Sequence, residues 1–296
     1  MSGQETQGQS QIQHLCQIGG VSRAGYYRHF EASAPARADM DLRGQIQLLS
    51  LRHRHYGYRR IAAQLKRNGL SVNAKRVLRL MREDNLLCQR QSPFVPRTTN
   101  SRHSFAIVPN LLWGLVPSGI NQIWVADITY IRLSEAFIYL AVVLDAFSRK
   151  VIGWALDSHI EARLAVAALD MALEARQPRP ETLIHHSDRG VQYACGEYTD
   201  RLKSRQIAIS MSRVGNPYDN AKAESFMKTL KTEEVNERAY KGLDHARLDI
   251  GNFINTVYNT ARLHSALGYK PPVEFEEALS PSQTCHKMAE PPMYLF

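Results

Sequence analysis

The stretch that decides the fold is Ile123-Trp-Val-Ala-Asp127-Ile-Thr-Tyr-Ile131. Its apolar and β-branched residues predict a strand, and a carboxylate lies in the middle of it. A second run of this kind, Thr182-Leu-Ile-His-His-Ser-Asp188, also ends on a carboxylate. A third carboxylate, Glu224, follows after a further 35 residues, in a segment whose pattern predicts a helix. The three acids are therefore expected on two strands and one helix.

Three such carboxylates could form an oxygen-rich site for a hard divalent cation, Mg²⁺ or Mn²⁺. Without metal, each pair at about 4 Å would repel by roughly 4 kcal/mol at an effective dielectric near 20. Two ions about 4 Å apart could activate a nucleophilic oxygen and stabilise the leaving oxygen at a phosphodiester. Water as nucleophile would give hydrolysis, and a DNA 3′-hydroxyl would give strand transfer. Taken singly, each acid is better explained as a buried, hydrogen-bonded side chain, and only their joint arrangement with Lys228 and Lys231 favours a metal site.

Two lysines share the predicted helix face with Glu224. Positions 224, 228 and 231 align because seven residues are nearly two helical turns. A face with one acid and two bases, Lys228 and Lys231, suits a site that holds metal and contacts phosphates. The alternative is that both lysines are solvated and pair only along the surface.

The charge of the chain is divided unevenly. Of 296 residues with a net charge of +9, residues 1–120 contain 17 basic and 6 acidic side chains, and the rest contain 20 and 22. The excess of basic residues in 1–120, attached to a nearly neutral remainder, predicts a polyanion-binding module in this N-terminal part, the basic front of the chain. The simpler alternative is that the charge serves general solubility. The four cysteines form no CxxC pair, and no apolar run has membrane-spanning length. We therefore expect a cytoplasmic protein, with neither a zinc site nor a membrane anchor.

The basic front predicts a helix-turn-helix. Asp41 could cap a first helix, Gly69 ends a second, and Asn73 could cap a third whose apolar face carries Val77, Leu80 and Met81. The third helix of such a motif enters the major groove. The candidate DNA-binding residues are Arg59, Arg60, Lys75, Arg76, Arg79 and Arg82. The alternative is a small helical bundle with a solvated basic face.

The pattern along the chain predicts four regions: helical residues 1–88, a basic linker at 89–121, an α/β core at 122–238 and a helical extension at 239–296. Strands are expected at 123–133, 137–144 and 150–156 as an antiparallel meander. Beyond them we expect a helix at 162–174, a strand from 182, a helix near 198–203 and a strand at 207–211. This order predicts a mixed sheet covered by helices on both faces. In the extension, the helical pattern ends at Pro271-Pro272.

Several motifs together resemble the OrfB-type catalytic subunit of bacterial insertion-sequence transposases, which are related to retroviral integrases. The similarity extends over residues 14–278, whereas residues 1–13 do not match the usual start. The motifs are Ser22-Arg-Ala-Gly-Tyr-Tyr27, Asp127-Ile-Thr-Tyr-Ile131, Leu144-Asp-Ala-Phe-Ser-Arg149 with Ile152-Gly-Trp154, His186-Ser-Asp188-Arg-Gly190 with Gln192-Tyr193, Asn220-Ala-Lys-Ala-Glu224 with Lys231, and Tyr258-Asn-Thr-Ala-Arg262-Leu-His264-Ser-Ala-Leu-Gly268.

The resemblance implies an RNase H-like core with Asp127, Asp188 and Glu224 as catalytic metal ligands. It implies Mg²⁺-dependent cleavage and joining of DNA, with Lys231 contacting DNA near the site. The implied partners are double-stranded DNA (the terminal inverted repeats of the element and the target), further copies of the chain in an oligomer on DNA, and an upstream-encoded helix-turn-helix polypeptide. The implied setting is the bacterial nucleoid. The roles of Arg262 and His264 stay open between packing and function.

Two other functions are compatible with parts of the sequence. A DNA-binding regulator with an inactive core would bind DNA regardless of Asp188 and yield no metal-dependent product. A tyrosine-type nuclease would use His185, His186 and Tyr193 and form a covalent adduct with DNA. Adjacent residues of a strand point to opposite faces, so the two histidines are not expected to bind one metal together.

Overall fold

The computed structural model describes residues 12–27, 39–88, 108–133, 136–212 and 220–279. The chain forms two compact units, Met1–Gln89 and Arg90–Phe296. Most of the segment expected as a linker lies outside the described residues. Its described end belongs to the second unit, where the Leu111 amide donates to Ser210 Oγ at 2.9 Å. The four-region division stays a prediction.

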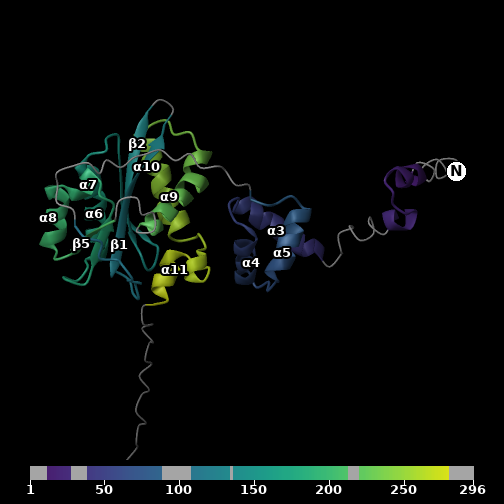
Figure 1. The fold of residues 1–296 in the computed structure, drawn as a ribbon, viewed down its shortest axis with the longest axis horizontal. Helices are drawn as coiled ribbons and strands as arrows, with labels where there is room; N and C mark the ends of the chain where they lie inside the picture. The colour runs from purple at the N-terminus through teal and green to yellow at the C-terminus, as the bar shows by residue number, and fades with distance from the viewer. Residues whose placement is uncertain (1–11, 28–38, 89–107, 134–135, 213–219, 280–296) are drawn as a thin grey trace, which may run out of the picture. The chain divides into compact units, whose positions relative to one another are not determined.

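The first unit contains a three-helix bundle of α3 (Met40–Arg52), α4 (Tyr58–Arg67) and α5 (Ala74–Glu83) (Figure 1). Residues 12–18 and 23–27 are also helical. Each helix of the bundle buries apolar residues at helical spacing, and the three helices contact one another. The buried residues are Leu42, Ile46, Leu49, Ile61, Leu65, Val77, Leu80 and Met81.

One of the two predicted helix caps is confirmed. Asn73 Oδ1 accepts a hydrogen bond from the Lys75 amide at 2.8 Å, which begins α5. The prediction for α3 is wrong, because Asp39 occupies the N-cap position and Asp41 lies in the first turn. Asp39 makes no capping bond. Its carboxylate accepts hydrogen bonds from Arg76 and Arg79 instead.

The second unit is built on a five-stranded sheet in the order β3-β2-β1-β4-β5. The strands are β1 (Ile123–Arg132), β2 (Phe137–Asp145), β3 (Val151–Asp157), β4 (Ile184–Ser187) and β5 (Ala208–Met211). The first three pair antiparallel, as the meander predicted, whereas β4 and β5 extend the sheet in parallel. The mixed sheet expected from the sequence is confirmed.

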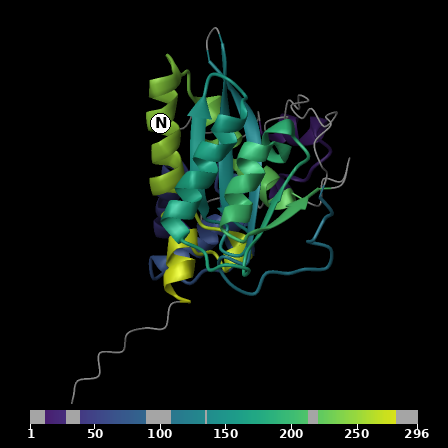
Figure 2. The ribbon, with the colours of Figure 1, turned by 90° about the vertical axis from the view of Figure 1, so that its left-hand side faces the viewer.

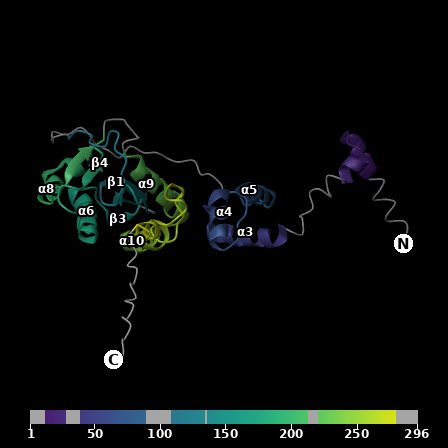
Figure 3. The ribbon, with the colours of Figure 1, turned by 90° about the horizontal axis from the view of Figure 1, so that it is seen from below.

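Helices cover both faces of this sheet (Figures 1 and 3). On one face lie α6 (Ala162–Arg176), α7 (Val191–Ala194) and α8 (Gly196–Ser204), and on the other lie α9 (Ala221–Glu233) and α10 (Leu243–Asn252). Each face has its own apolar core. Helix α6 lies so close to β3 that a Cβ at Gly153 would stand 2.1 Å from the Ala168 carbonyl oxygen. Glycine is therefore required in the Ile152-Gly-Trp154 motif.

The extension after α9 packs on the α9 face of the sheet. It includes η2 (Val235–Glu237), α10, the π-helix η3 (Phe253–Tyr258), η4 (Ser265–Leu267) and α11 (Pro272–Glu277). The prediction that helix ends at the proline pair is wrong, because Pro272 begins α11. Proline is favoured in the first turn, where its missing N–H would have no helical acceptor. None of the helices in the described residues is long and apolar enough to span a membrane.

Candidate active site

Asp127 and Asp188 lie side by side on neighbouring parallel strands. The register pairs Val125 on β1 with His186 on β4, and each carboxylate follows its strand residue by two positions. Asp127 lies inside β1, while Asp188 comes directly after β4. Each uses one oxygen to accept a backbone N–H, from Ile128 at 2.9 Å and from Gly190 at 2.8 Å. Strand pairing and these hydrogen bonds thus fix both carboxylates locally.

Helix α9 brings the third carboxylate to the same region. Its N-cap residue, Asn220, is buried and donates from Nδ2 to the Ala126 carbonyl at 3.0 Å, beside Asp127. The buried face of α9 is formed by Ala223, Phe226, Met227 and Leu230. Glu224 lies off this face and is exposed. The helix end is therefore tied to β1 next to the first carboxylate.

The surroundings of Asp127 and Glu224 disfavour a negative charge on either carboxyl group. Burial, and then repulsion from Asp188 and Glu224, raise the pKa of Asp127 to about 8, against an ordinary value of 3.8. Burial also raises the pKa of Glu224. Asp127 keeps part of its surface exposed, so solvent can reach it. A cation bound here would favour the charged forms of these groups.

The two lysines of α9 are placed differently. Lys231 is half-buried, and its ammonium lies 4.3 Å from the centre of the Tyr130 ring, a cation–π contact. Burial lowers the pKa of Lys231, while the charge of Asp127 raises it. Lys228 is exposed. Lys231 is thus within electrostatic range of the carboxylates, and Lys228 lies on the surface.

The fit of this region to a divalent cation rests on its donor chemistry. The acids supply oxygen ligands only, which suits Mg²⁺ or Mn²⁺. Beside them, the Tyr193 hydroxyl is buried without a hydrogen-bond partner in the described residues, and both aspartates influence its pKa. No group of three or more acidic, histidine or cysteine side chains in the described residues converges to metal-binding distance. Glu224 would have to turn inward to complete such a site.

The histidines of β4 are structural. His185 is fully buried, receives or donates a hydrogen bond with the Tyr198 hydroxyl at 2.9 Å, and has its pKa lowered by burial to about 3. His186 points to the other face and bonds Ser210 Oγ at 2.9 Å and Ser212 Oγ at 3.0 Å. Tyr193 is 3% exposed, and burial raises its pKa well above the usual range. A nuclease using these residues would lack an accessible nucleophile.

In the first unit, the basic residues of α5 divide into two groups. The buried Asp39 carboxylate pairs with Arg76 and accepts from Arg79 at 2.9 Å. Arg79 also donates to Glu83 at 2.8 Å, and Arg43 of α3 pairs with Glu83 and Asp84. Arg76 and Arg79 therefore tie α5 to the start of α3.

The remaining candidate DNA-binding residues lie on the surface of the bundle. Lys75 and Arg82 are exposed, seven positions apart on α5, and form no ion pair with the described residues. On α4, the Arg59 guanidinium lies 5.3 Å from the centre of the Tyr58 ring, and that of Arg60 lies 5.6 Å from the centre of the Tyr56 ring. The bundle thus presents several cations to solvent.

Family models match both units. An integrase core domain matches residues 117–217 and a second integrase core model matches 205–272, while a helix-turn-helix-like domain matches 37–94. The chain is 34% identical to the transposase InsF for insertion sequence IS3A of Escherichia coli over 91% of this chain and 95% of that protein. The chain belongs to the insertion-sequence transposases.

Other similar proteins agree in part. A 31 kDa protein of insertion element IS600 from Shigella sonnei is 39% identical over 89% of this chain and 97% of its own length. The HTLV-2 integrase catalytic core domain in complex with magnesium aligns with 53% of this chain and 96% of its own at 18% identity, with a TM-score of 0.42. The expected class, an integrase-type mixed α/β core preceded by a helical helix-turn-helix region, is confirmed. The transposase is a polynucleotidyl transferase that binds DNA.

The structure shows the contacts of Arg262 and His264, whose roles the sequence left open between packing and function. Arg262 donates to both oxygens of Glu233 at 2.7 and 2.8 Å, and the two side chains are 7% and 11% exposed. His264 is buried, stands edge-on to the Tyr258 ring and bonds the Tyr258 carbonyl at 3.4 Å. Sequence reasoning missed the Arg262–Glu233 pair, which joins the extension to the end of α9.

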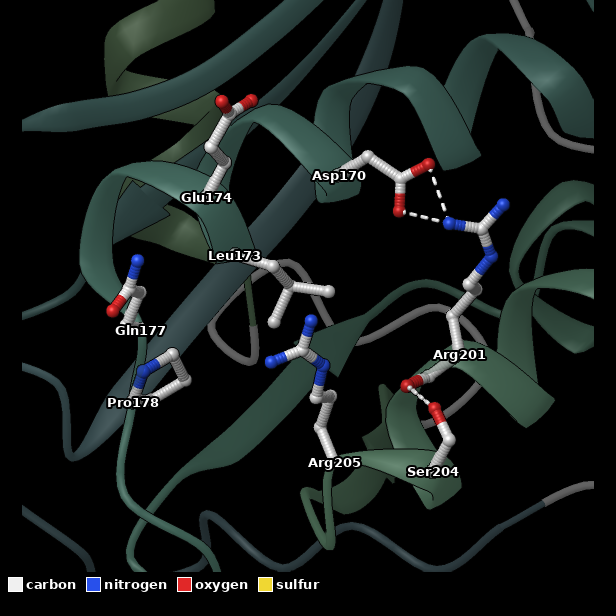
Figure 4. A pocket seen from close by; sticks show the side chains of 8 residues that line it. All are labelled: Asp170, Leu173, Glu174, Gln177, Pro178, Arg201, Ser204 and Arg205. Carbon is white, nitrogen blue, oxygen red and sulfur yellow. Dashed lines mark hydrogen bonds and ion pairs between the residues drawn. The ribbon is translucent and has the colours of Figure 1, made fainter.

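A cleft between α6 and α8 lies apart from the carboxylates (Figure 4). It has a volume of about 580 Å³ and includes Asp170 and Leu173 from α6, Arg201 from α8 and Arg205, the C-cap residue of α8. Arg201 Nη1 contacts both oxygens of Asp170 at 2.5 and 2.7 Å. None of the three candidate carboxylates lines this cleft, so it is not part of the candidate active site.

Proposed function

We propose that Asp127, Asp188 and Glu224 are the catalytic residues of this transposase and that they bind two divalent ions, Mg²⁺ or Mn²⁺. The observation that carries the proposal is the pairing of β1 with β4, which brings Asp127 and Asp188 together, while Asn220 holds the start of α9 at the Ala126 carbonyl beside them. Ordinary carboxyl groups avoid this arrangement, because each added charge destabilises the others. Oxygen-only donors at a transposase core suit hard cations.

The reaction that we propose is cleavage of phosphodiesters at the ends of an insertion sequence, followed by strand transfer. The bound ions would activate the attacking oxygen, from water or a DNA 3′-hydroxyl, and stabilise the leaving oxygen. Asp127 and Asp188 would be oriented by their backbone hydrogen bonds. Lys231 would neutralise a phosphate beside them, held in place by the Tyr130 ring, and Lys228 would contact the backbone further out.

The DNA partners that we propose are the terminal inverted repeats of the element and the target duplex. Arg59, Arg60, Lys75 and Arg82 would contact phosphates or bases there, because all four belong to the basic surface of the helix-turn-helix. Arg76 and Arg79 would contribute by fixing α5 and would contact DNA less directly. Joining two ends requires more than one active site, which supports an oligomer on DNA, with an upstream-encoded partner as a further component.

The decisive experiment is strand cleavage and joining on a labelled duplex that carries the end of the element. Wild type and Asp188→Asn are compared with Mg²⁺ or Mn²⁺. The matched control is Asp200→Asn, since Asp200 is an exposed carboxylate of α8. We expect metal-dependent products from wild type and the control, and a loss of about a thousandfold or more in Asp188→Asn, because charge stabilisation at the phosphate is lost.

The product lengths distinguish the two possible nucleophiles. Joined products longer than the substrate indicate attack by a 3′-hydroxyl, whereas shortened strands alone indicate hydrolysis. Products of equal yield from Asp188→Asn and wild type would refute the catalytic assignment. DNA binding without any product from either protein, even with the upstream partner added, would favour a DNA-binding role.

A further inference from the structure

Two aromatic residues and an arginine share one face of the β1–β2 hairpin. The register places Arg132 opposite Phe137 and Tyr130 opposite Tyr139. Directly opposed residues of antiparallel strands lie on the same face, and so do residues two apart on one strand. Figure 2 shows the end of the sheet where β1 ends and β2 begins. Tyr130, Arg132 and Phe137 lie on one face near these strand ends.

The contacts in this group connect it to the candidate active site. The Tyr130 and Phe137 rings stand edge-on, with their centroids 5.7 Å apart. Lys231 lies over the Tyr130 ring and within electrostatic range of Asp127. Tyr130 follows Asp127 by three residues, which is about 10 Å along a strand. Strand alternation places the Tyr130 and Asp127 side chains on opposite faces of the sheet, so Lys231, which contacts the Tyr130 ring and is influenced by the charge of Asp127, is the link between the two groups.

Phe137 is unusual for a large apolar side chain because 52% of its surface is exposed. Arg132 beside it is exposed and forms no ion pair with the described residues. Single exposed apolar residues are common on protein surfaces. What distinguishes this group is the combination of an open ring, an exposed guanidinium and a lysine within electrostatic range of Asp127.

We propose that Phe137, supported by Tyr130 and Arg132, stacks an unpaired nucleobase of the DNA strand that enters the candidate active site. The inference rests on the proposed function and identifies a second feature of its substrate. Aromatic rings flanked by cations bind single-stranded DNA by stacking on bases and neutralising phosphates. A base inside a duplex has no free face, so the occupant is a base at a frayed or unpaired end.

The test uses the full-length protein and two probes, a blunt duplex and the same duplex with a short single-stranded tail containing 2-aminopurine. Fluorescence quenching reports stacking, and anisotropy reports affinity. Wild type binds the tailed probe more tightly and quenches it. In Phe137→Leu, the preference for the tail falls about fivefold or more, as expected when one base no longer stacks, while affinity for the blunt duplex is unchanged.

The matched control is Phe137→Tyr, which keeps the ring and is expected to keep both the preference and the quenching. Equal affinity and quenching in wild type and Phe137→Leu would overturn the proposal. The proposal would also be overturned if Phe137→Tyr lost the preference and the quenching as fully as Phe137→Leu. Position 137 would then require the shape of phenylalanine and not an aromatic ring for stacking. Cleavage by wild type of a duplex carrying the element's end is measured in parallel with the upstream partner added, and its absence would refute the proposed function separately.

Discussion

Asp39 in the first unit and Asp127 in the second are aspartates in opposite electrostatic situations. Asp39 is buried against Arg76 and Arg79, whose hydrogen bonds lower its pKa. Asp127 lies among other acids, and its pKa rises to about 8. The charge of Asp39 is neutralised by side chains of the same chain. Asp127 has more negative charge around it than the described residues neutralise.

This difference distinguishes a charge that is neutralised by partners within the protein from a charge that requires a bound ligand to neutralise it. An ion pair satisfied inside the protein fixes two elements together, as Asp39 does for α3 and α5. A group of acids without a counterion costs free energy until a cation binds. The sequence identified Asp127 as a candidate metal ligand, but the partners of Asp39 are visible only in the structure.

The largest effect is expected from breaking the compensated pair at the end of α9. Arg262→Ala leaves Glu233 buried without its partner, so the free energy of unfolding should fall by about 3–5 kcal/mol. Chemical denaturation of the wild type and the variant measures this loss. The double variant Arg262→Leu with Glu233→Leu should recover most of it. If the double variant lost as much free energy of unfolding as Arg262→Ala, the unpaired charge of Glu233 would not be the cause of that loss.

Neutralising Asp127 should have the opposite effect and raise the free energy of unfolding. The pKa of Asp127 in the folded protein is about 8, above its ordinary value of 3.8. Between these values the folded protein keeps a proton that the unfolded chain releases, so the metal-free protein loses stability as pH rises from about 4 to about 8. Asp127→Asn should remove this decline and raise Tm at pH 8 by about 2–4 °C for each kcal/mol relieved.

Calorimetry without divalent metal at pH 6 and pH 8 measures that difference. Addition of Mg²⁺ at pH 8 should then raise the Tm of wild type and leave that of Asp127→Asn nearly unchanged, because binding stabilises only a protein with a site. Asp200→Asn serves again as the control. A wild-type Tm independent of pH over this range would contradict the electrostatic account.

The smallest effect is expected on the surface of α5. Replacing Lys75 and Arg82 by alanine should reduce the slope of log affinity against log salt by up to about 0.9 for each phosphate that the protein no longer neutralises, without changing Tm. Replacing Arg76 and Arg79 should lower Tm, because Asp39 loses both partners. If replacing Arg76 and Arg79 changed the salt dependence of DNA binding and left Tm unchanged, our division of the basic residues of α5 would be reversed. Arg76 and Arg79 would then contact DNA instead of holding α5 in place.

Much of the architecture could be predicted because local patterns determine it. Apolar periodicity identified the bundle helices, the three-strand meander and the strands that carry Asp127 and Asp188. Asn73 was recognisable as a cap because capping depends on residues two or three positions away. The prediction for Asp41 failed because the start of α3 depends on Asp39, whose partners are 37 and 40 residues distant.

The parts of the site that sequence reasoning missed depend on distant contacts. The bond from Asn220 to the Ala126 carbonyl joins residues 94 positions apart, and the pair of Arg262 with Glu233 joins residues 29 apart. Neither has a local pattern. The contact of Lys231 with Tyr130 likewise depends on how α9 crosses β1. The types of residue were visible in the sequence, but their partners required the fold.

Helix α9 is fastened at both ends, by Asn220 to β1 and by Glu233 to the extension. Because both ends of α9 are held, the helix cannot slide along the sheet. The distances between its side chains along the axis are therefore fixed. Glu224 and Lys231 stand about 10 Å apart along its axis. Duplex DNA rises about 3.4 Å per base pair. This separation equals the rise of roughly three base pairs, and the contacts at the two ends of α9 hold it constant.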